Sequence, residues 1–157
     1  MSTLIHLIYT LLLALWVGGI SLFTFIVTPD IFRAYSRDAA GEIVGKLFPS
    51  YFLFMLVLSV LVLFMLFPCR VILGQSGFRW SLVAAVIAVV INFFVFFKLH
   101  PEIRQIKQEI HSFQSLQTNS PSREKFRKLH AVSMTLNLIL LADGAALLLI
   151  GTVIRDK

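Results

Sequence analysis

Residues 3–28 read TLIHLIYTLLLALWVGGISLFTFIVT and contain no Asp, Glu, Lys or Arg. A helix needs about 20 mostly apolar residues to cross the hydrocarbon core of a bilayer. A cleavable secretory signal has a basic start and an apolar stretch of about 7–15 residues, and this stretch has neither feature. It therefore predicts an uncleaved, membrane-spanning α-helix.

Three more runs of this kind follow, so the chain is predicted to cross the membrane about four times. The predicted spans are residues 3–28, 48–67, 80–97 and 131–154. Hydrocarbon offers no water to a free backbone N–H or C=O, and the alternation of a membrane β-barrel is absent, so each span should be helical. The 157 residues are 58% hydrophobic and only 14% charged, unlike a soluble domain. The predicted fold is a single-domain, all-α integral membrane protein, an antiparallel four-helix transmembrane bundle.

Prolines and glycines predict where these helices begin and end. Pro29 is expected to end the first span, because a proline disfavours helix in the residue before it. Pro49 fits the first turn of the second span, and Pro68 is expected to end that span. Residues 74–77 predict a short turn, and Pro101 should bend or end the third span.

Two connectors have a helical pattern of their own. Residues 36–46 and 101–116 each carry apolar side chains at helical spacing, with charged side chains on the other faces. This pattern predicts amphipathic helices that lie at the membrane interface after the first and third spans. The alternative for residues 101–116 is a soluble extension of the third span.

The basic residues predict the orientation of the chain and its surroundings. Of the 14 Lys and Arg residues, ten lie in the connectors after spans one and three, and four lie on the other side. The positive-inside rule then places both termini outside and the long connectors in the cytoplasm. The net charge is +6, and the basic residues lie between the apolar runs, where they can contact anionic lipid headgroups. The sequence contains no nucleic-acid-binding motif. The predicted partner is therefore the lipid bilayer and not nucleic acid.

Polar side chains within the spans mark the first candidate site. Asp143 lies near the middle of the fourth span, where an acid costs about 2.5–3.5 kcal/mol to insert. Ser133 and Asn137 lie on a polar stripe of the same helix, and Asn92 lies at a similar depth in the third span, where it could bond to Asn137. Asp143 is either a proton-carrying or ligand-binding acid or a protonated packing group, and the stripes are either a site or seams between helices.

Histidines and sulfur atoms mark the second candidate site. His6 is predicted near the outer face, whereas His100 and His130 are predicted near the inner face, roughly 30 Å away. His100 and His130 could therefore share a metal or a haem iron, and His6 could not join them. His6 could pair instead with Met65 and Cys69, because thioether, thiolate and imidazole together suit Cu(I). The alternative is that each histidine is an interfacial anchor.

Several stretches resemble a known family. They are LWVGGISLFTFIVTPDIFRAYSRDAAGEIVGKLFPSYF (15–52), LHPEIRQIKQEI (99–110) and FRKLHAVSMTLNLILL (126–141). Together they resemble the small bacterial membrane proteins of the domain of unknown function 4149 family, which is related to transmembrane protein 205. The resemblance implies a bacterial inner-membrane location and, through the eukaryotic relative, an association with metal tolerance.

A more distant resemblance involves His6 and the Trp16-Val17-Gly18-Gly19 run. These residues resemble the copper-resistance protein D group and the four-helix, haem-containing protoporphyrinogen oxidases. In the oxidases a histidine early in helix one matters for haem, so the resemblance implies haem b as a cofactor and His6 as a haem residue. Only His6 matches by position.

Three functions follow as hypotheses. The first is a protein without an enzymatic site, acting as a helix-packing partner subunit or in metal or stress tolerance, because the common phosphate, dinucleotide and hydrolase motifs are absent. The second is a haem-binding redox protein. The third is a small proton-coupled transporter that uses Asp143, for which a chain this short would need to form a homo-oligomer or join other membrane proteins.

Overall fold

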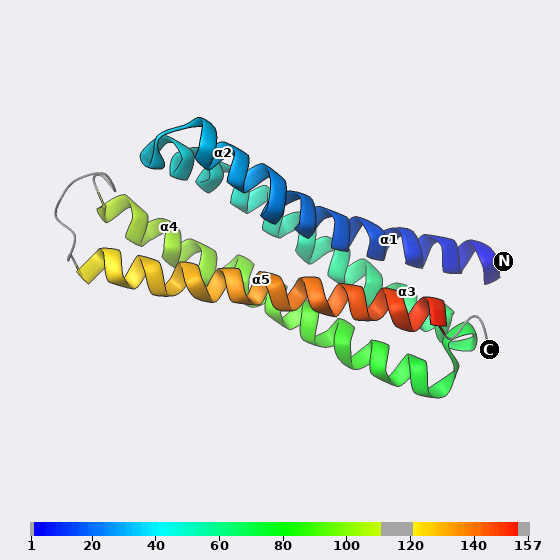
Figure 1. The fold of residues 1–157 in the computed structure, drawn as a ribbon. Coiled ribbons are helices and arrows are strands. Elements are labelled where there is room, and N and C mark those ends of the chain that lie inside the picture. The colour runs from blue at the N-terminus through cyan, green and yellow to red at the C-terminus, as the bar shows by residue number, and fades with distance from the viewer. Residues whose placement is uncertain (1, 111–120, 154–157) are drawn as a thin grey trace.

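The computed structural model describes residues 2–110 and 121–153, and the regular secondary structure of this part of the chain is all helix (Figure 1). The predicted all-α fold is thus confirmed for the described residues. In chain order the elements are α1 (Ser2–Leu22), η1 (Phe23–Val27), α2 (Thr28–Ala34), α3 (Arg37–Phe94), η2 (Val95–Leu99), α4 (His100–Glu109) and α5 (Pro121–Val153).

Among the described residues, three helical stretches are long and apolar enough to cross a membrane, namely Thr3–Ala34, Arg37–Glu109 and Pro121–Gly151. The middle stretch contains α3, whose 58 residues would measure about 87 Å as a straight helix. That length is almost three times the thickness of the hydrocarbon core, which is about 30 Å. A straight α3 is therefore incompatible with a bilayer.

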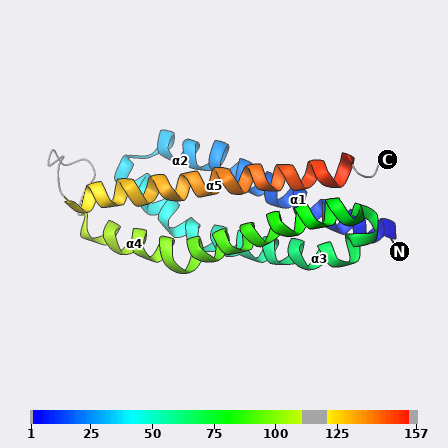
Figure 2. The same ribbon diagram turned by 90° about the horizontal axis from the view of Figure 1, so that it is seen from below.

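Gly74 interrupts α3. Its φ of 64° and ψ of 173° are non-helical, and this φ is the only positive one among the described residues. Glycine tolerates such an angle because it has no Cβ. The chain turns back at this point (Figures 1 and 2), which divides α3 into a first arm, residues 37–73, and a second arm, residues 75–94. The turn predicted at residues 74–77 is confirmed at Gly74.

The two ends of the molecule differ. The start of α1, the Gly74 turn and the end of α5 lie at one end, here called the terminal end (Figures 1 and 2). The opposite end holds α2, the start of α3, α4 and the start of α5, and is here called the connector end.

The helix boundaries predicted at Pro29, Pro49 and Pro68 are wrong, because helix continues through each of these prolines, and the third span does not end at Pro101. Pro49 and Pro68 lie inside α3, and Pro29 and Pro101 each lie in the first turn of a helix that continues the preceding one. The π-helical turns η1 and η2 come directly before α2 and α4, where Thr28 N–H donates to the Phe23 carbonyl and the second turn repeats this pattern. A proline lacks an N–H and crowds the carbonyl four residues earlier, and a widened turn relieves both problems.

The connector helices continue the long helices, which corrects the prediction of separate interfacial helices. Residues 37–46 are the beginning of α3, capped by Ser36, whose hydroxyl accepts from Ala39 N–H. Residues 100–109 form α4 and follow η2 without a break, as in the extension alternative. The remainder of the second predicted helix, from residue 111, lies outside the described residues.

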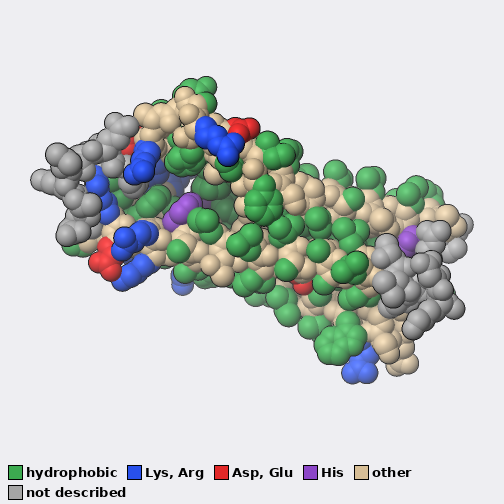
Figure 3. Space-filling view, in the orientation of Figure 1, with side chains coloured by type: hydrophobic (Ala, Val, Ile, Leu, Met, Phe, Trp, Pro, Cys, Tyr) green, Lys and Arg blue, Asp and Glu red, His purple; other side chains and the backbone are tan. Residues whose placement is uncertain are grey.

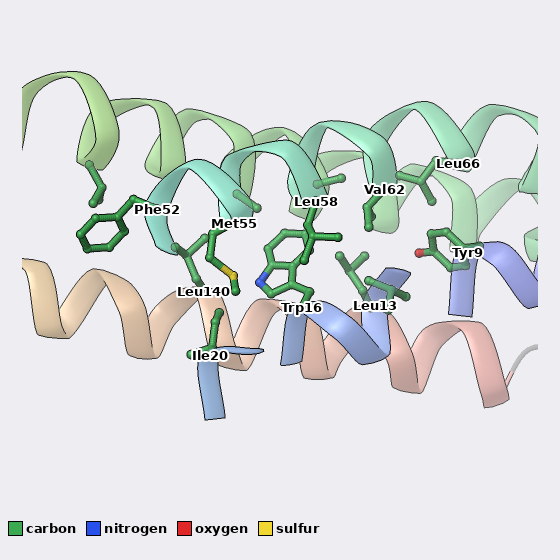
Figure 4. Packing of buried hydrophobic residues seen from close by; sticks show 14 of the residues in the cluster. Tyr9, Leu13, Trp16, Ile20, Phe52, Met55, Leu58, Val62, Leu66 and Leu140 are labelled. Atoms are coloured by element: carbon green, nitrogen blue, oxygen red, sulfur yellow. The ribbon is translucent and has the colours of Figure 1, made fainter. Parts of the chain in front are cut away.

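The core runs along the inner face of α1. Tyr9, Leu13, Trp16 and Ile20 recur every three or four residues, all are buried, and they point towards the first arm (Figure 4). α1 and α5 pack closely, because a Cβ placed on Gly144 would lie 3.0 Å from Val17 Cγ2. Large apolar side chains cover much of the exterior (Figure 3), as expected of a surface that faces lipid.

Candidate functional site

A pocket of about 720 Å³ lies at the connector end. Four segments distant in sequence form it: α2, the start of α3, α4 and the start of α5. Figure 3 shows Lys and Arg side chains gathered around a hollow in this part of the surface. The residues that line the pocket are Thr28, Phe32, Arg37, Gly41, Glu42, Val44, Gly45, Lys46, Phe48, Pro49, His100, Ile103, Arg104, Lys107, Gln108, Phe126 and His130.

The lining of the pocket is strongly basic. It contains four basic side chains, from Arg37, Lys46, Arg104 and Lys107, but only one acidic side chain, from Glu42. Glu42 pairs with Lys46 at 2.8 Å on the exposed rim. Within the described part of the chain, neither Arg37 nor Arg104 has an ion-pair partner. Three positive charges are thus left uncompensated by the lining itself.

Lys107 is the innermost of these cations, and two glycines make room for it. Its ammonium donates to the Gly41 carbonyl, and a Cβ on Gly45 would lie 3.1 Å from Lys107 Nζ. Burial lowers the pKa of Lys107, while the carboxylates of Glu42 and Asp38 act in the opposite direction. The Ala-Gly-rich start of α3 is therefore the surface on which this side chain lies.

Two imidazoles share the pocket, since His100 and His130 both line it. His100 makes edge contacts with Phe48 and Phe52, at 5.9 and 5.5 Å between ring centroids, and His130 stacks on Phe126 at 5.8 Å. No side chain or backbone group of the described ranges is hydrogen-bonded to the ring nitrogens of either histidine. The aromatic contacts hold the rings while the nitrogens stay available to a ligand.

Asn137 is part of a hydrogen-bonded triad inside the bundle. Tyr51 Oη donates to Asn137 Oδ1 at 2.7 Å, and Asn137 Nδ2 donates to Thr24 Oγ1 at 2.8 Å. The predicted bond between Asn137 and Asn92 is wrong, because Tyr51 and Thr24 occupy the Asn137 amide. Asn92 is 1% exposed, and its amide has no partner among the described residues. The sequence analysis did not predict Tyr51 as a partner of Asn137. The available signal was a tyrosine, which has a polar hydroxyl, within an otherwise apolar span.

Asp143 lies in the terminal half of the interior. Its Oδ2 atom is buried and has no hydrogen-bond partner in the part of the chain that the structure describes. Ser133, the remaining predicted member of this polar site, is half-buried on α5, nearer the connector end.

His6 and the two sulfur ligands predicted for it, Met65 and Cys69, differ in burial. Cys69 is fully buried, Met65 is half-buried, and His6 Nδ1 is buried without a partner among the residues described. In the same residues, no group of three or more His, Cys, Asp or Glu side chains could hold a metal ion. Methionine is not among these ligand types, so a copper site at His6, Met65 and Cys69 stays a prediction.

Comparison with known proteins identifies the family. A family model described as "Domain of unknown function (DUF4149)" matches residues 11–112, which include α2, η2, α4 and most of the pocket lining. The chain belongs to the DUF4149 family.

One relative is an uncharacterized protein of Aquifex aeolicus (strain VF5). It is 30% identical over 141 residues, which are 88% of this chain and 92% of the relative. No solved structure matches. The wider resemblances of this DUF4149 protein, to transmembrane protein 205, the copper-resistance protein D group and the protoporphyrinogen oxidases, stay predictions.

Proposed function

We propose that this DUF4149 protein crosses the bacterial inner membrane four times, with both termini outside, and binds an anionic phospholipid in its cytoplasmic pocket. The Gly74 turn supports the fourth crossing, because each arm of α3 is long enough for one span. The positive-inside bias supports the orientation, because ten of the 14 Lys and Arg residues lie towards the connector end. In this orientation the pocket lies at the cytoplasmic face.

The single observation that carries the ligand assignment is the pairing of basic and aromatic groups in one pocket. Arg37, Arg104 and Lys107 provide cationic donors, while Phe32 and Phe126 provide apolar surface in the same lining. A phospholipid requires both, since its phosphate needs charged donors and its acyl chains need apolar contact. The volume of about 720 Å³ lies within the usual range of ligand pockets.

The binding test uses thermal unfolding of the full chain in a neutral detergent, with and without added lipid. Phosphatidylglycerol should raise the melting temperature, because a ligand at 100 times its Kd stabilises the folded state by about 2.7 kcal/mol. Phosphatidylcholine, which has no net charge, should raise it far less. A third measurement adds inorganic phosphate in place of lipid. It shows whether the phosphate group alone is sufficient to raise the melting temperature.

A charge-matched pair of variants shows whether the pocket is responsible. The double substitution Arg104→Gln and Lys107→Gln should remove most of the phosphatidylglycerol effect. The control is Arg70→Gln with Arg79→Gln, which removes the same charge next to the Gly74 turn. Equal losses in the two double variants would mean that the lipid responds to net charge and not to this pocket.

Haem b is a second candidate ligand, favoured by the two imidazoles whose ring nitrogens are unbonded within the described structure. The lining fits the group: His100 and His130 would be its iron ligands, and Arg104 and Lys107 would bind its propionates. Bound haem would supply one-electron transfer. Protein expressed with added haem should then show a Soret band that is lost in both His100→Ala and His130→Ala, and a colourless protein would exclude this candidate.

A role as a partner subunit is compatible with lipid binding. The apolar exterior suits contact with other membrane helices as well as with lipid. We propose that the protein acts as a partner subunit or in metal or stress tolerance, and that its pocket binds lipid without catalysing a reaction.

A further inference from the structure

A second, smaller pocket adjoins the first one at the connector end. Its volume is about 410 Å³, and η2 and α4 provide all of its lining except Pro49 of the first arm. Four residues line both pockets, namely Pro49, His100, Arg104 and Gln108. The two pockets therefore meet along a shared row of side chains.

Most of this row belongs to one side of α4, where its members recur every four residues. They are His100, Arg104 and Gln108, and they are here called the ridge. On one flank of the ridge, Ile103 and Lys107 line only the first pocket. On the other flank, Pro101 and Gln105 line only the second pocket. The ridge thus separates the two pockets.

The second pocket combines an aromatic part on η2 with a polar part on α4. Phe96 and Phe97 line the first part, and Arg104 and Gln105 line the second. Phe97 is 57% exposed, and its ring contacts that of Phe96 with 4.9 Å between the centroids. Exposed aromatic side chains at the end of a span are typical of the membrane interface. In the proposed orientation, the aromatic part faces the bilayer and the polar part faces the cytoplasm, which is the order of acyl chain and phosphate in the cytoplasmic leaflet.

We propose that one anionic phospholipid occupies both pockets, with its phosphate at Arg104 and one acyl chain on each side of the ridge. This inference rests on the proposed function, and it specifies the ligand as a lipid with two acyl chains. Arg104 suits this role because it is the only Lys or Arg among the residues that line both pockets, and a guanidinium can bind a phosphate through two parallel hydrogen bonds. One chain contacts Phe32 and Phe126 in the first pocket, and the other contacts Phe97 in the second.

The second chain should add affinity because it is tethered to a phosphate that is already bound. Its entry into the second pocket is then an intramolecular step. We expect phosphatidylglycerol to bind about tenfold more tightly than lysophosphatidylglycerol, which has the same headgroup and only one chain.

Thermal unfolding of the full chain in a neutral detergent tests this preference. The lipid concentration that gives half of the rise in melting temperature measures the affinity for each lipid. Phosphatidylcholine and lysophosphatidylcholine form the neutral control pair, which reports the effect of chain number on the detergent micelle. The preference for two chains should appear only in the anionic pair, and an equal preference in the neutral pair would overturn the proposal.

Two substitutions in the second pocket and one control locate the second chain. Phe97→Ala removes apolar surface from the pocket and Gln105→Trp fills it, so each should abolish the preference for phosphatidylglycerol over lysophosphatidylglycerol. Phe94→Ala is the matched control and should keep the preference, because Phe94 is also exposed but lines neither of these two pockets.

The possible failures of the two proposals differ. Equal affinity for the two anionic lipids in the unsubstituted protein would overturn the two-chain site and leave the lipid pocket in place. A preference that persists in Phe97→Ala or Gln105→Trp would likewise overturn the placement of the second chain. The absence of any rise in melting temperature with either anionic lipid would instead overturn the proposed function.

Discussion

At the scale of single residues, Lys107 and the glycines beneath it offer the sharpest test of the pocket. Gly45→Val should push the ammonium away from the Gly41 carbonyl, because a Cβ at that position already lies 3.1 Å from Lys107 Nζ. We expect phosphatidylglycerol affinity to fall about tenfold, the equivalent of one lost charge-assisted bond. Gly18→Ala is the control, because the Cβ that this substitution adds would have no atom within 4 Å. Equal affinity in the two variants would contradict the assigned role of Lys107.

The pKa of Lys107 leads to a pH prediction. Burial lowers this pKa, so the ammonium loses its charge at a lower pH than an exposed lysine does, although Glu42 and Asp38 partly oppose the shift and Lys46 adds to it. Lipid affinity should therefore be complete below the lowered pKa and decline as the pH rises through it. Lys107→Arg should keep the affinity constant over that range, because a guanidinium stays charged. A decline that is identical in this variant would assign it to other groups.

Tyr51 shows what a single hydrogen bond contributes to the fold. Tyr51→Phe leaves Asn137 Oδ1 without its 2.7 Å donor, and we expect the free energy of unfolding to fall by about 1–3 kcal/mol. The measurement is denaturant unfolding in detergent. Tyr35→Phe removes a hydroxyl from a side chain that is 56% exposed, and it should leave stability unchanged.

At the scale of elements, the apolar runs and the turn at Gly74 were predictable, and the effect of the prolines on the helices was not. Transfer of side chains into lipid depends on composition, so residues 3–28 could be assigned without a structure. A proline is tolerated when a π-helical turn precedes it, as at Pro29 and Pro101. That turn depends on backbone bonds five residues apart, which residue type alone does not specify.

The Gly74 turn is the element on which the topology depends. Gly74→Ala forces a Cβ into a left-handed conformation, at a cost of about 1–2 kcal/mol, although the space around it is open. We expect a corresponding loss in the free energy of unfolding, whereas Gly18→Ala within α1 should lose nothing. An unchanged stability in Gly74→Ala would indicate that α3 does not turn at this residue.

At the scale of the whole molecule, candidate site residues could be grouped from the sequence only where their depth in the membrane was enough to place them together. Span ends alone placed His100 and His130 at one face, and the structure brings both to one pocket. The Lys107 bond to Gly41 joins residues 66 positions apart, and the Asn137 partners lie 86 and 113 positions away. Such pairs depend on which helices are neighbours and on their rotation, and hydropathy does not encode either property.

The central claim is that the chain crosses the membrane four times with its basic pocket in the cytoplasm, and thiol labelling of intact cells tests it most directly. In a Cys69→Ala background, Gln75→Cys places an exposed thiol beside the Gly74 turn and Gln105→Cys places one on α4. A membrane-impermeant reagent should label Gln75→Cys in intact cells and Gln105→Cys only after the cells are permeabilised. Labelling of both from the same side, or of Gln105→Cys alone from outside, would contradict the account.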